Sequence, residues 1–316
     1  MNRRALLKLL ATSVPVSSGS TAGAQVIDSS KQVRFIVPVG PGSGVDSLTR
    51  SVAKQFTALT GAAAYVDNKP GGDMIIGVQA FLSSPPDGRT ILALTQTPMV
   101  LNPILRDDLR YDAERDIRPI SYATRGTAVL VVSGNSNFTS FKEFIAAARL
   151  KPSGMTLANY GQTYRIGGLD LARRAGVTFV ETPYKGATQA NADVVGGVVD
   201  AHLTDVGSAM GLIRGGRLKA LAVASETRHP FLPEVPTISE SGLPGYTLYT
   251  WVGYGVHGKT SDAIVSSLEA SFIKILKSSD SVEYSKMGGS EIIAGDGARM
   301  REHIARETAR FRSLLK

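Results

Sequence analysis

The sequence predicts an α/β protein whose strands are mostly parallel. Short apolar and β-branched runs, such as 33–37, alternate with segments in which apolar residues recur every three or four positions, such as 47–59. This alternation of strand and helix patterns is typical of a parallel sheet covered by helices. The chain has 316 residues, which is more than one average domain and therefore favours two structural units.

The same pattern continues along the chain. After the first strand and helix, a strand–helix–strand unit is expected at 63–66, 75–82 and 90–94. The Pro-rich stretch 230–236 interrupts the pattern and is typical of a connector. Periodicity and cap residues predict the remaining elements, which are strands at 128–132, 155–158, 177–180, 201–204 and 218–223, and helices at 141–150, 169–175, 189–195, 262–276 and 297–315.

The N-terminus has the composition of an export signal. It begins with basic residues that include Arg3 and Arg4, continues with an apolar middle from 5 to 16, and ends with a small-residue cleavage site at 22–24. The paired arginines followed by leucines resemble the twin-arginine type of signal. We therefore expect residues 1–24 to be removed when the protein is exported to the periplasm.

Composition and motif content exclude several classes of function. The net charge of +8 includes three basic residues of the predicted signal, and no Lys/Arg run follows, so a nucleic-acid partner is not expected. The absence of Cys excludes thiolate zinc sites, iron–sulfur clusters and a cysteine nucleophile. The four histidines lack metal-ligand spacing, and neither G-x-S-x-G nor H-E-x-x-H occurs. We therefore expect no metal, no cofactor and no enzymatic activity.

A Gly-rich turn, Gly40–Gly44, separates the first predicted strand from the first predicted helix. Glycines at such a turn let backbone N–H groups converge at a helix N-terminus, which favours an anion. A plain tight turn and a nucleotide site are the alternatives. The nucleotide motif G-x-G-x-x-G would need glycine at Val45 or Ser47, and no Gly-Lys-Ser/Thr motif is present. An anion-binding turn is therefore the favoured interpretation.

Two further residues follow predicted strands and could contact a ligand. Arg165 lies after the strand 155–158 in an expected loop that is rich in hydrogen-bonding side chains. Its guanidinium could bind a carboxylate in bidentate geometry or remain solvated. Asp205 follows the strand 201–204 and could either cap the next helix or contact a ligand.

An ordered series of motifs runs through nearly the whole mature chain. The first, residues 38–46 with Arg50, is close to the pattern P-F-x-P-G-G-x-x-D-x-x-A-R. The later motifs are Asn68–Gly71, Pro86–Leu92, Asp116–Ile120, Pro183–Gly186, Val195–Asp200, Gly216–Val223 and Pro233–Thr237. Together they resemble the Bug-type solute receptors, which are the extracytoplasmic substrate-binding proteins of tripartite tricarboxylate transporters.

The resemblance implies a two-lobed α/β periplasmic binding protein, a Venus-flytrap of the type II-like class with two crossing hinge segments. One lobe would comprise 25–127 and 236–316, and the other would comprise 128–235. The cleft would hold a small carboxylate: a di- or tricarboxylate, an amino acid or an aromatic acid. The resemblance also implies a monomer that delivers this ligand to the membrane subunits of a transporter. A sensor protein as the partner and a nucleotide-dependent enzyme built on the Gly40–Gly44 turn are the alternatives.

The second-lobe loop departs from the family pattern S-S-G-x-G-S. Tyr164 and Ile166 replace two of its glycines, which removes room for close approach of the backbone. Tyr164 could instead form an aromatic wall, and Arg165 a side-chain clamp. Asp46 is expected to order the turn rather than touch the ligand. The candidate ligand-binding residues are Pro41, Gly42, Ser43, Gly44, Asp46, Gln96, Gln162, Thr163, Tyr164, Arg165 and Asp205.

Overall fold

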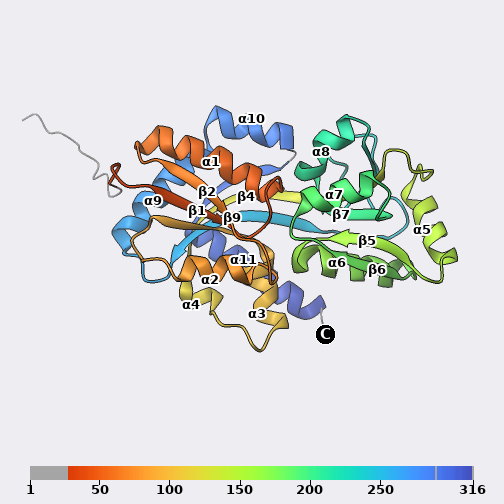
Figure 1. Ribbon diagram of the computed structural model, residues 1–316, viewed down its shortest axis with the longest axis horizontal. Helices are drawn as coiled ribbons and strands as arrows, with labels where there is room; N and C mark the ends of the chain where they lie inside the picture. The colour runs from red at the N-terminus through yellow and green to blue at the C-terminus, as the bar shows by residue number, and fades with distance from the viewer. Residues whose placement is uncertain (1–27, 289, 315–316) are drawn as a thin grey trace, which may run out of the picture.

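The computed structural model describes residues 28–288 and 290–314, so the predicted export signal lies outside the described residues. The chain forms two lobes that lie side by side along the long axis of the molecule (Figure 1). Their strands form one hydrogen-bonded path, in which β4 (Ile117–Ser133) belongs to both lobes. The α/β class predicted from the sequence is confirmed.

The first lobe is built on a mixed sheet. As expected, β1 (Val33–Val37) pairs in parallel with β2 (Ala64–Asn68) and β3 (Thr90–Leu94). Antiparallel β9 (Tyr249–His257) then joins β3 to β4, and β10 (Glu291–Asp296) also pairs with β4. Its helical segments are α1 (Gly44–Thr60), α2 (Ile75–Leu82), η1 (Thr97–Leu101), α3 (Asn102–Leu105), α4 (Ala113–Asp116), α9 (Asp262–Leu276), α10 (Ser279–Gly288) and α11 (Gly297–Leu314).

The second lobe has a smaller sheet, in which β5 (Met155–Asn159) lies second from one edge. β5 pairs in parallel with β6 (Phe179–Pro183) and with β7 (Ala201–Asp205). The last part of β4 pairs with β7 and with β8 (Leu218–Val223). The helices of this lobe are α5 (Phe141–Leu150), α6 (Gly161–Ala175), α7 (Ala187–Val195) and α8 (Val206–Arg214).

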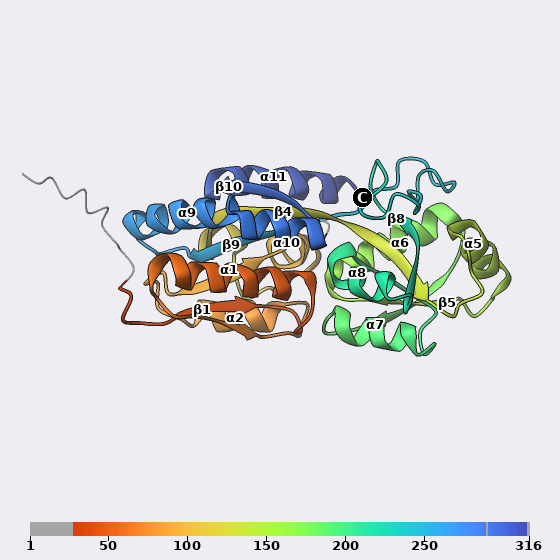
Figure 2. The same ribbon diagram turned by 90° about the horizontal axis from the view of Figure 1, so that it is seen from above.

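The lobes are joined by β4, which Figure 2 shows running from one lobe into the other. Thr127 pairs with Tyr249 of β9, whereas the next residue, Ala128, pairs with Asp205 of β7. The strand therefore changes its partner between lobes at a single peptide unit while its backbone hydrogen bonding continues. No flexible loop separates the lobes at this first crossing.

The second crossing returns the chain to the first lobe. The amide of Ile238 donates to Val223 O and that of Leu248 donates to Ala224 O, at 2.9 and 2.8 Å. These bonds tie 237–248 to the second lobe. We therefore propose that the crossing lies at Leu248–Tyr249, later in the chain than the boundary at 236 expected from the sequence.

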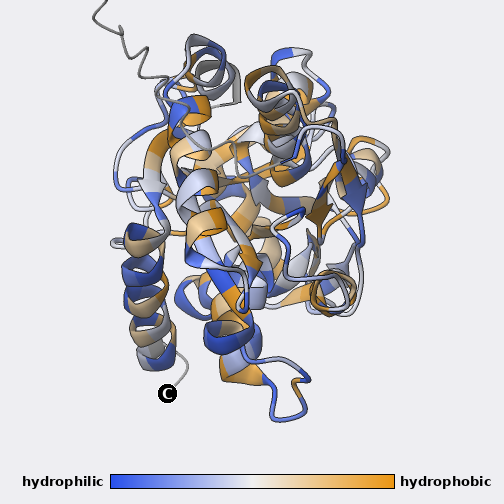
Figure 3. Ribbon diagram, turned by 90° about the vertical axis from the view of Figure 1, so that its left-hand side faces the viewer, coloured by the Kyte–Doolittle hydropathy of each residue, from blue (hydrophilic) through white to orange (hydrophobic). Residues whose placement is uncertain are grey.

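An aromatic cluster unites the two chain segments of the first lobe. Phe35 of β1 packs against Phe56 of α1, Tyr254 of β9 and Phe272 of α9, with ring centroids 5.8 to 6.2 Å apart. All four side chains are fully buried. Figure 3 shows hydrophobic residues gathered on the strands and a largely hydrophilic α11. The C-terminal segment is therefore part of the core of the first lobe.

Several elements differ from the sequence expectation. β9, β10 and the first half of β4 were not expected, because Gly253 and Gly255 in β9, and Pro119 and Gly126 in β4, are residues that normally interrupt strands. The expected loop that contains Arg165 is instead the first turn of α6, which begins at Gly161. Within the described ranges, no helix is long and apolar enough to cross a membrane, and no group of three acidic or histidine side chains could hold a metal ion.

The close packing of β9 generates a prediction about stability. A Cβ atom on Gly253 would lie 2.6 Å from Ser121 O and 2.8 Å from Met300 Sδ. Gly253→Ala should therefore lower the free energy of unfolding by about 1–3 kcal/mol, the usual cost of overpacking. Urea denaturation followed by circular dichroism measures this change.

The control is Gly211→Ala in α8, where a Cβ atom meets nothing within 4 Å. This variant should be neutral or stabilising by up to about 1 kcal/mol, because alanine favours a helix over glycine. Equal stability of the two variants would contradict the packing argument.

Candidate functional site

A cavity lies between the lobes where the N-terminus of α1 faces the ends of β5 and β7. Gly44 and Val45 of α1 line it from the first lobe. Tyr160, Tyr164 and Asp205 line it from the second lobe. Three chain segments therefore meet at this cavity: the one that follows β1 in the first lobe, and those that follow β5 and β7 in the second lobe.

The turn before α1 is held by its own side chains. Ser43 is the N-cap residue, and its hydroxyl accepts from the Asp46 amide at 3.2 Å. The Asp46 carboxylate in turn accepts from the Gly42 amide at 2.9 Å, from Arg50 Nε at 3.0 Å and from Asn68 Nδ2 at 2.9 Å. Burial alone would raise the pKa of Asp46, but these hydrogen bonds hold it below its ordinary value. Asp46, in the first helical turn of α1, is thus a buried and ionised anchor for the Gly-rich turn.

Glycines of the turn also permit close contact between the lobes. The Gly40 amide donates to Lys185 O at 3.0 Å, and Thr188 Oγ1 donates to Pro41 O at 2.8 Å. A Cβ atom on Gly186 would lie 3.1 Å from the Cα and N atoms of Gly40. The turn therefore forms a backbone contact across the cleft, a function that its sequence pattern did not reveal.

Asp205 has two structural partners at the cavity. Its Oδ1 accepts from the Ser208 amide at 2.7 Å, which makes Asp205 the N-cap residue of α8. Its Oδ2 accepts from the Tyr160 hydroxyl. A Cβ atom on Gly44 would collide with Asp205 Oδ1, so the carboxylate reaches the N-terminus of α1 in the opposite lobe. The capping role and a position at the cavity are therefore compatible.

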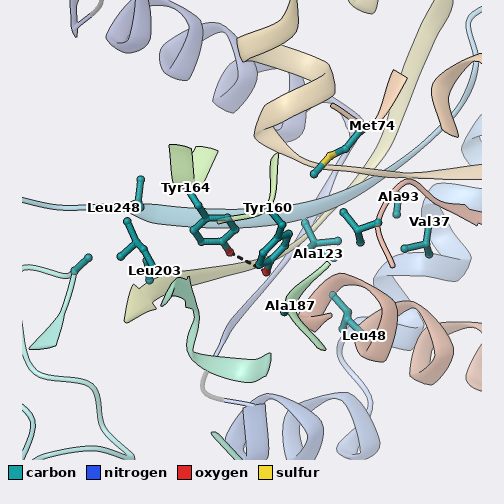
Figure 4. Close-up of a cluster of buried hydrophobic side chains, with 14 of the residues drawn as sticks. Val37, Leu48, Met74, Ala93, Ala123, Tyr160, Tyr164, Ala187, Leu203 and Leu248 are labelled. Atoms are coloured by element: carbon teal, nitrogen blue, oxygen red, sulfur yellow. Dashed lines mark hydrogen bonds between the residues drawn. The ribbon is translucent and has the colours of Figure 1, made fainter. Parts of the chain in front are cut away.

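Two tyrosines form an aromatic wall of the cavity. The ring centroids of Tyr160 and Tyr164 lie 4.6 Å apart and their hydroxyl oxygens 3.3 Å apart. Figure 4 shows the two side chains next to each other, joined by this hydrogen bond. Burial and the nearby Asp205 charge raise the pKa of both hydroxyls well above its usual value, so both remain protonated donors. Tyr160 was not among the expected residues, although its position directly after β5 could have indicated it.

Other expected residues lie outside the cavity lining. Arg165 Nε pairs with Glu181 Oε2 of β6 at 2.9 Å, and Arg165 Nη1 donates to Gln162 Oε1 at 3.3 Å. A carboxylate clamp by Arg165 would therefore require this ion pair to be exchanged. The amide group of Gln96 donates to Glu307 Oε2 at 2.8 Å, so Gln96 supports α11.

Thr163 and Trp251 also lie where the two lobes meet. Thr163 Oγ1 lies 3.5 Å from Thr97 Oγ1, a contact between the two lobes. Trp251 lines the cavity and is 2% exposed, and in the described part of the structure its indole N–H has no acceptor. The indole ring packs against His303 of α11 with ring centroids 5.5 Å apart, so Trp251 supports the contact between β9 and α11.

Two lobes that share a crossing strand and enclose a cavity define the class of periplasmic binding proteins. Solved structures agree with this assignment. A protein of R. palustris solved with adipate superimposes with a TM-score of 0.86 at 27% identity, over 90% of this chain and 95% of that chain. The periplasmic binding protein BugD superimposes with a TM-score of 0.84 at 26% identity, over 90% and 96% of the two chains. The expected two-lobed fold is confirmed.

The family follows from the sequence comparisons. The model of the tripartite tricarboxylate transporter family receptor matches residues 48–316. A relative from Pseudomonas sp. strain P51, described as a UPF0065 protein in the tcbD–tcbE intergenic region, is 33% identical over 320 residues, covering 100% of this chain and 94% of the relative. The chain belongs to this receptor family, which confirms the resemblance to Bug-type receptors and the expectation that the protein is not an enzyme.

The contact between Gly40 and Gly186 generates a prediction about the lobe arrangement. Gly186→Ala should push the lobes apart, because the added methyl group meets backbone atoms that cannot move aside. The chain has no natural Cys, so spin labels can be attached to cysteines introduced by Lys54→Cys and Arg214→Cys. Double electron–electron resonance should then report a longer distance between the lobes.

Gly196→Ala is the matched control, because Gly186 and Gly196 flank the two ends of α7. A Cβ atom on Gly196 lies 3.4 Å from Ala192 O, an ordinary contact. Its distance distribution should equal that of the parent protein. An unchanged distribution in Gly186→Ala would show that the contact does not control the lobe arrangement.

Proposed function

We propose that the protein is a periplasmic receptor that binds a small carboxylate between its lobes. In this proposal it is exported by the signal at 1–24 and acts as a monomer. It delivers the ligand to the membrane subunits of a tripartite tricarboxylate transporter. Membership of the receptor family supports the transport role, and the adipate bound to the R. palustris relative supports a carboxylate ligand.

The observation that carries the proposal is the N-terminus of α1 at the cavity between the lobes. Gly44 and Val45 are the first two residues of α1, so their amides have no acceptor within the helix. The helix dipole adds partial positive charge at the same point. A carboxylate bound there would accept these hydrogen bonds.

Ligand binding would stabilise the closed arrangement of the lobes. The cavity walls come from both lobes, so a bound molecule contacts both only when they are together. The contacts of Gly40 with Lys185 and of Pro41 with Thr188 add to this arrangement. A membrane partner could distinguish the closed form by its surface. We place Gly42, Ser43 and Asp46 in support of the turn, and Gln162, Thr163 and Arg165 at the cleft edge.

A thermal-shift screen of the mature protein tests the proposal. Dicarboxylates including adipate, tricarboxylates, amino acids and aromatic acids are compared with nucleotides. A true ligand at ~100 times its dissociation constant should stabilise the protein by about 2.7 kcal/mol. Isothermal titration calorimetry then gives the affinity. Stabilisation by nucleotides alone, or by no carboxylate, would overturn the proposed function.

A further inference from the structure

Two features with opposite ligand preferences lie side by side in the cavity. The N-terminus of α1 offers the Gly44 and Val45 amides, which favour a carboxylate. The Asp205 carboxylate lies against Gly44, so close that a Cβ atom there would overlap its Oδ1. An acidic side chain thus stands directly beside the position that favours an anion.

Asp205 retains capacity for another hydrogen-bond donor. A carboxylate offers about four acceptor positions. The protein occupies two of them, through the Ser208 amide and the Tyr160 hydroxyl. The remaining capacity is available to a ligand in the cavity that Asp205 lines.

The charge of Asp205 limits which chemical groups of a ligand can lie beside it. Among the described residues that line the cavity, Asp205 is the single one with a formal charge. The described ion pairs of the structure include no cation on Asp205. A ligand group next to Asp205 is therefore favoured if it carries positive charge, and a second carboxylate there would be repelled.

We propose that the ligand is a small α-amino acid, whose carboxylate binds the N-terminus of α1 and whose ammonium group binds Asp205. The adjacency of Gly44 and Asp205 sets this geometry, because it requires the anion and the donor to sit on neighbouring carbon atoms. The inference rests on the proposed carboxylate-receptor function and specifies its ligand class.

The size of the cavity favours a short side chain. Its volume is about 50 Å³, and the aromatic rings of Tyr160 and Tyr164 limit it on the side of the second lobe. This small space favours a short ligand over an extended one. The smallest matched ligands therefore make the most informative probes.

The experiment uses two series of carboxylic acids, and the members of each series differ from one another in a single substituent. Alanine, lactate and propionate share three carbons, and aspartate, malate and succinate share four; in each series the substituent next to a carboxylate is ammonium, hydroxyl or hydrogen. Calorimetry with the mature protein should give the order ammonium, hydroxyl, hydrogen, with about tenfold or greater separation between the first and the last. Equal or tighter binding of the unsubstituted or hydroxy acids would overturn the inference.

Asp205→Asn identifies the residue responsible. Asn is as good an N-cap as Asp, so α8 keeps its cap, while the negative charge and one acceptor oxygen are lost. The comparison uses whichever series binds more tightly to the parent protein. The affinity for its amino acid, alanine or aspartate, should fall about tenfold or more. The affinity for its unsubstituted acid, propionate or succinate, should change by less than about threefold. Equal losses for both partners would assign Asp205 a structural role and overturn the inference.

Asp193→Asn is the control variant. Asp193 also lies in the second lobe and accepts a tyrosine hydroxyl, that of Tyr184, at 2.6 Å, but it does not line the cavity. It should leave all six affinities unchanged. If adipate or an aromatic acid binds while none of the six probes does, the carboxylate-receptor function stands and the α-amino-acid inference fails. If no carboxylate of any class binds, both fail.

Discussion

The unbroken backbone pairing of β4 is the constraint on which the two-lobed structure depends. One strand of 17 residues satisfies its hydrogen bonds first with β9 and then with β7. A buried strand cannot leave its amides and carbonyls unpaired, so both sheets must meet it in register. That register places the end of β7, and therefore Asp205, opposite the start of α1. The cavity between the lobes is thus a consequence of strand pairing.

Two capped helix N-termini and a tyrosine meet in the cleft between the lobes. Ser43 caps α1 and Asp205 caps α8, so two helix N-termini approach each other from opposite lobes. Each cap satisfies one helix amide and leaves the neighbouring amides to whatever occupies the cavity. Tyr160 fixes the Asp205 side chain through its hydroxyl. The groups that the described residues present to the cavity are therefore backbone amides and a single acid rather than a cluster of basic side chains.

Much of this fold could be predicted from local pattern, because β1 is a short apolar run and α1 and α5 combine clear periodicity with side-chain caps. The strand β9 could not be predicted in this way. Gly253 and Gly255 normally interrupt strands, and here they are needed because neighbouring segments leave little room for a Cβ atom. At the site, the Gly40–Gly44 turn was recognised as a helix N-terminus, but its contact with Lys185 depends on the meeting of distant segments. The partner of Arg165 is Glu181, on a strand that follows α6, and a single sequence does not reveal such a pairing.

The continuous β4 strand also has a mechanical consequence. If the lobes rotate, the motion must twist a hydrogen-bonded ribbon, because the first crossing contains no loop that could act as a free pivot. A twisted ribbon resists further torsion and returns toward its resting shape. The lobes would then behave as an elastic pair, in which energy stored during motion in one direction speeds motion in the other. Ligand residence time would in this way be set partly by the stiffness of this strand.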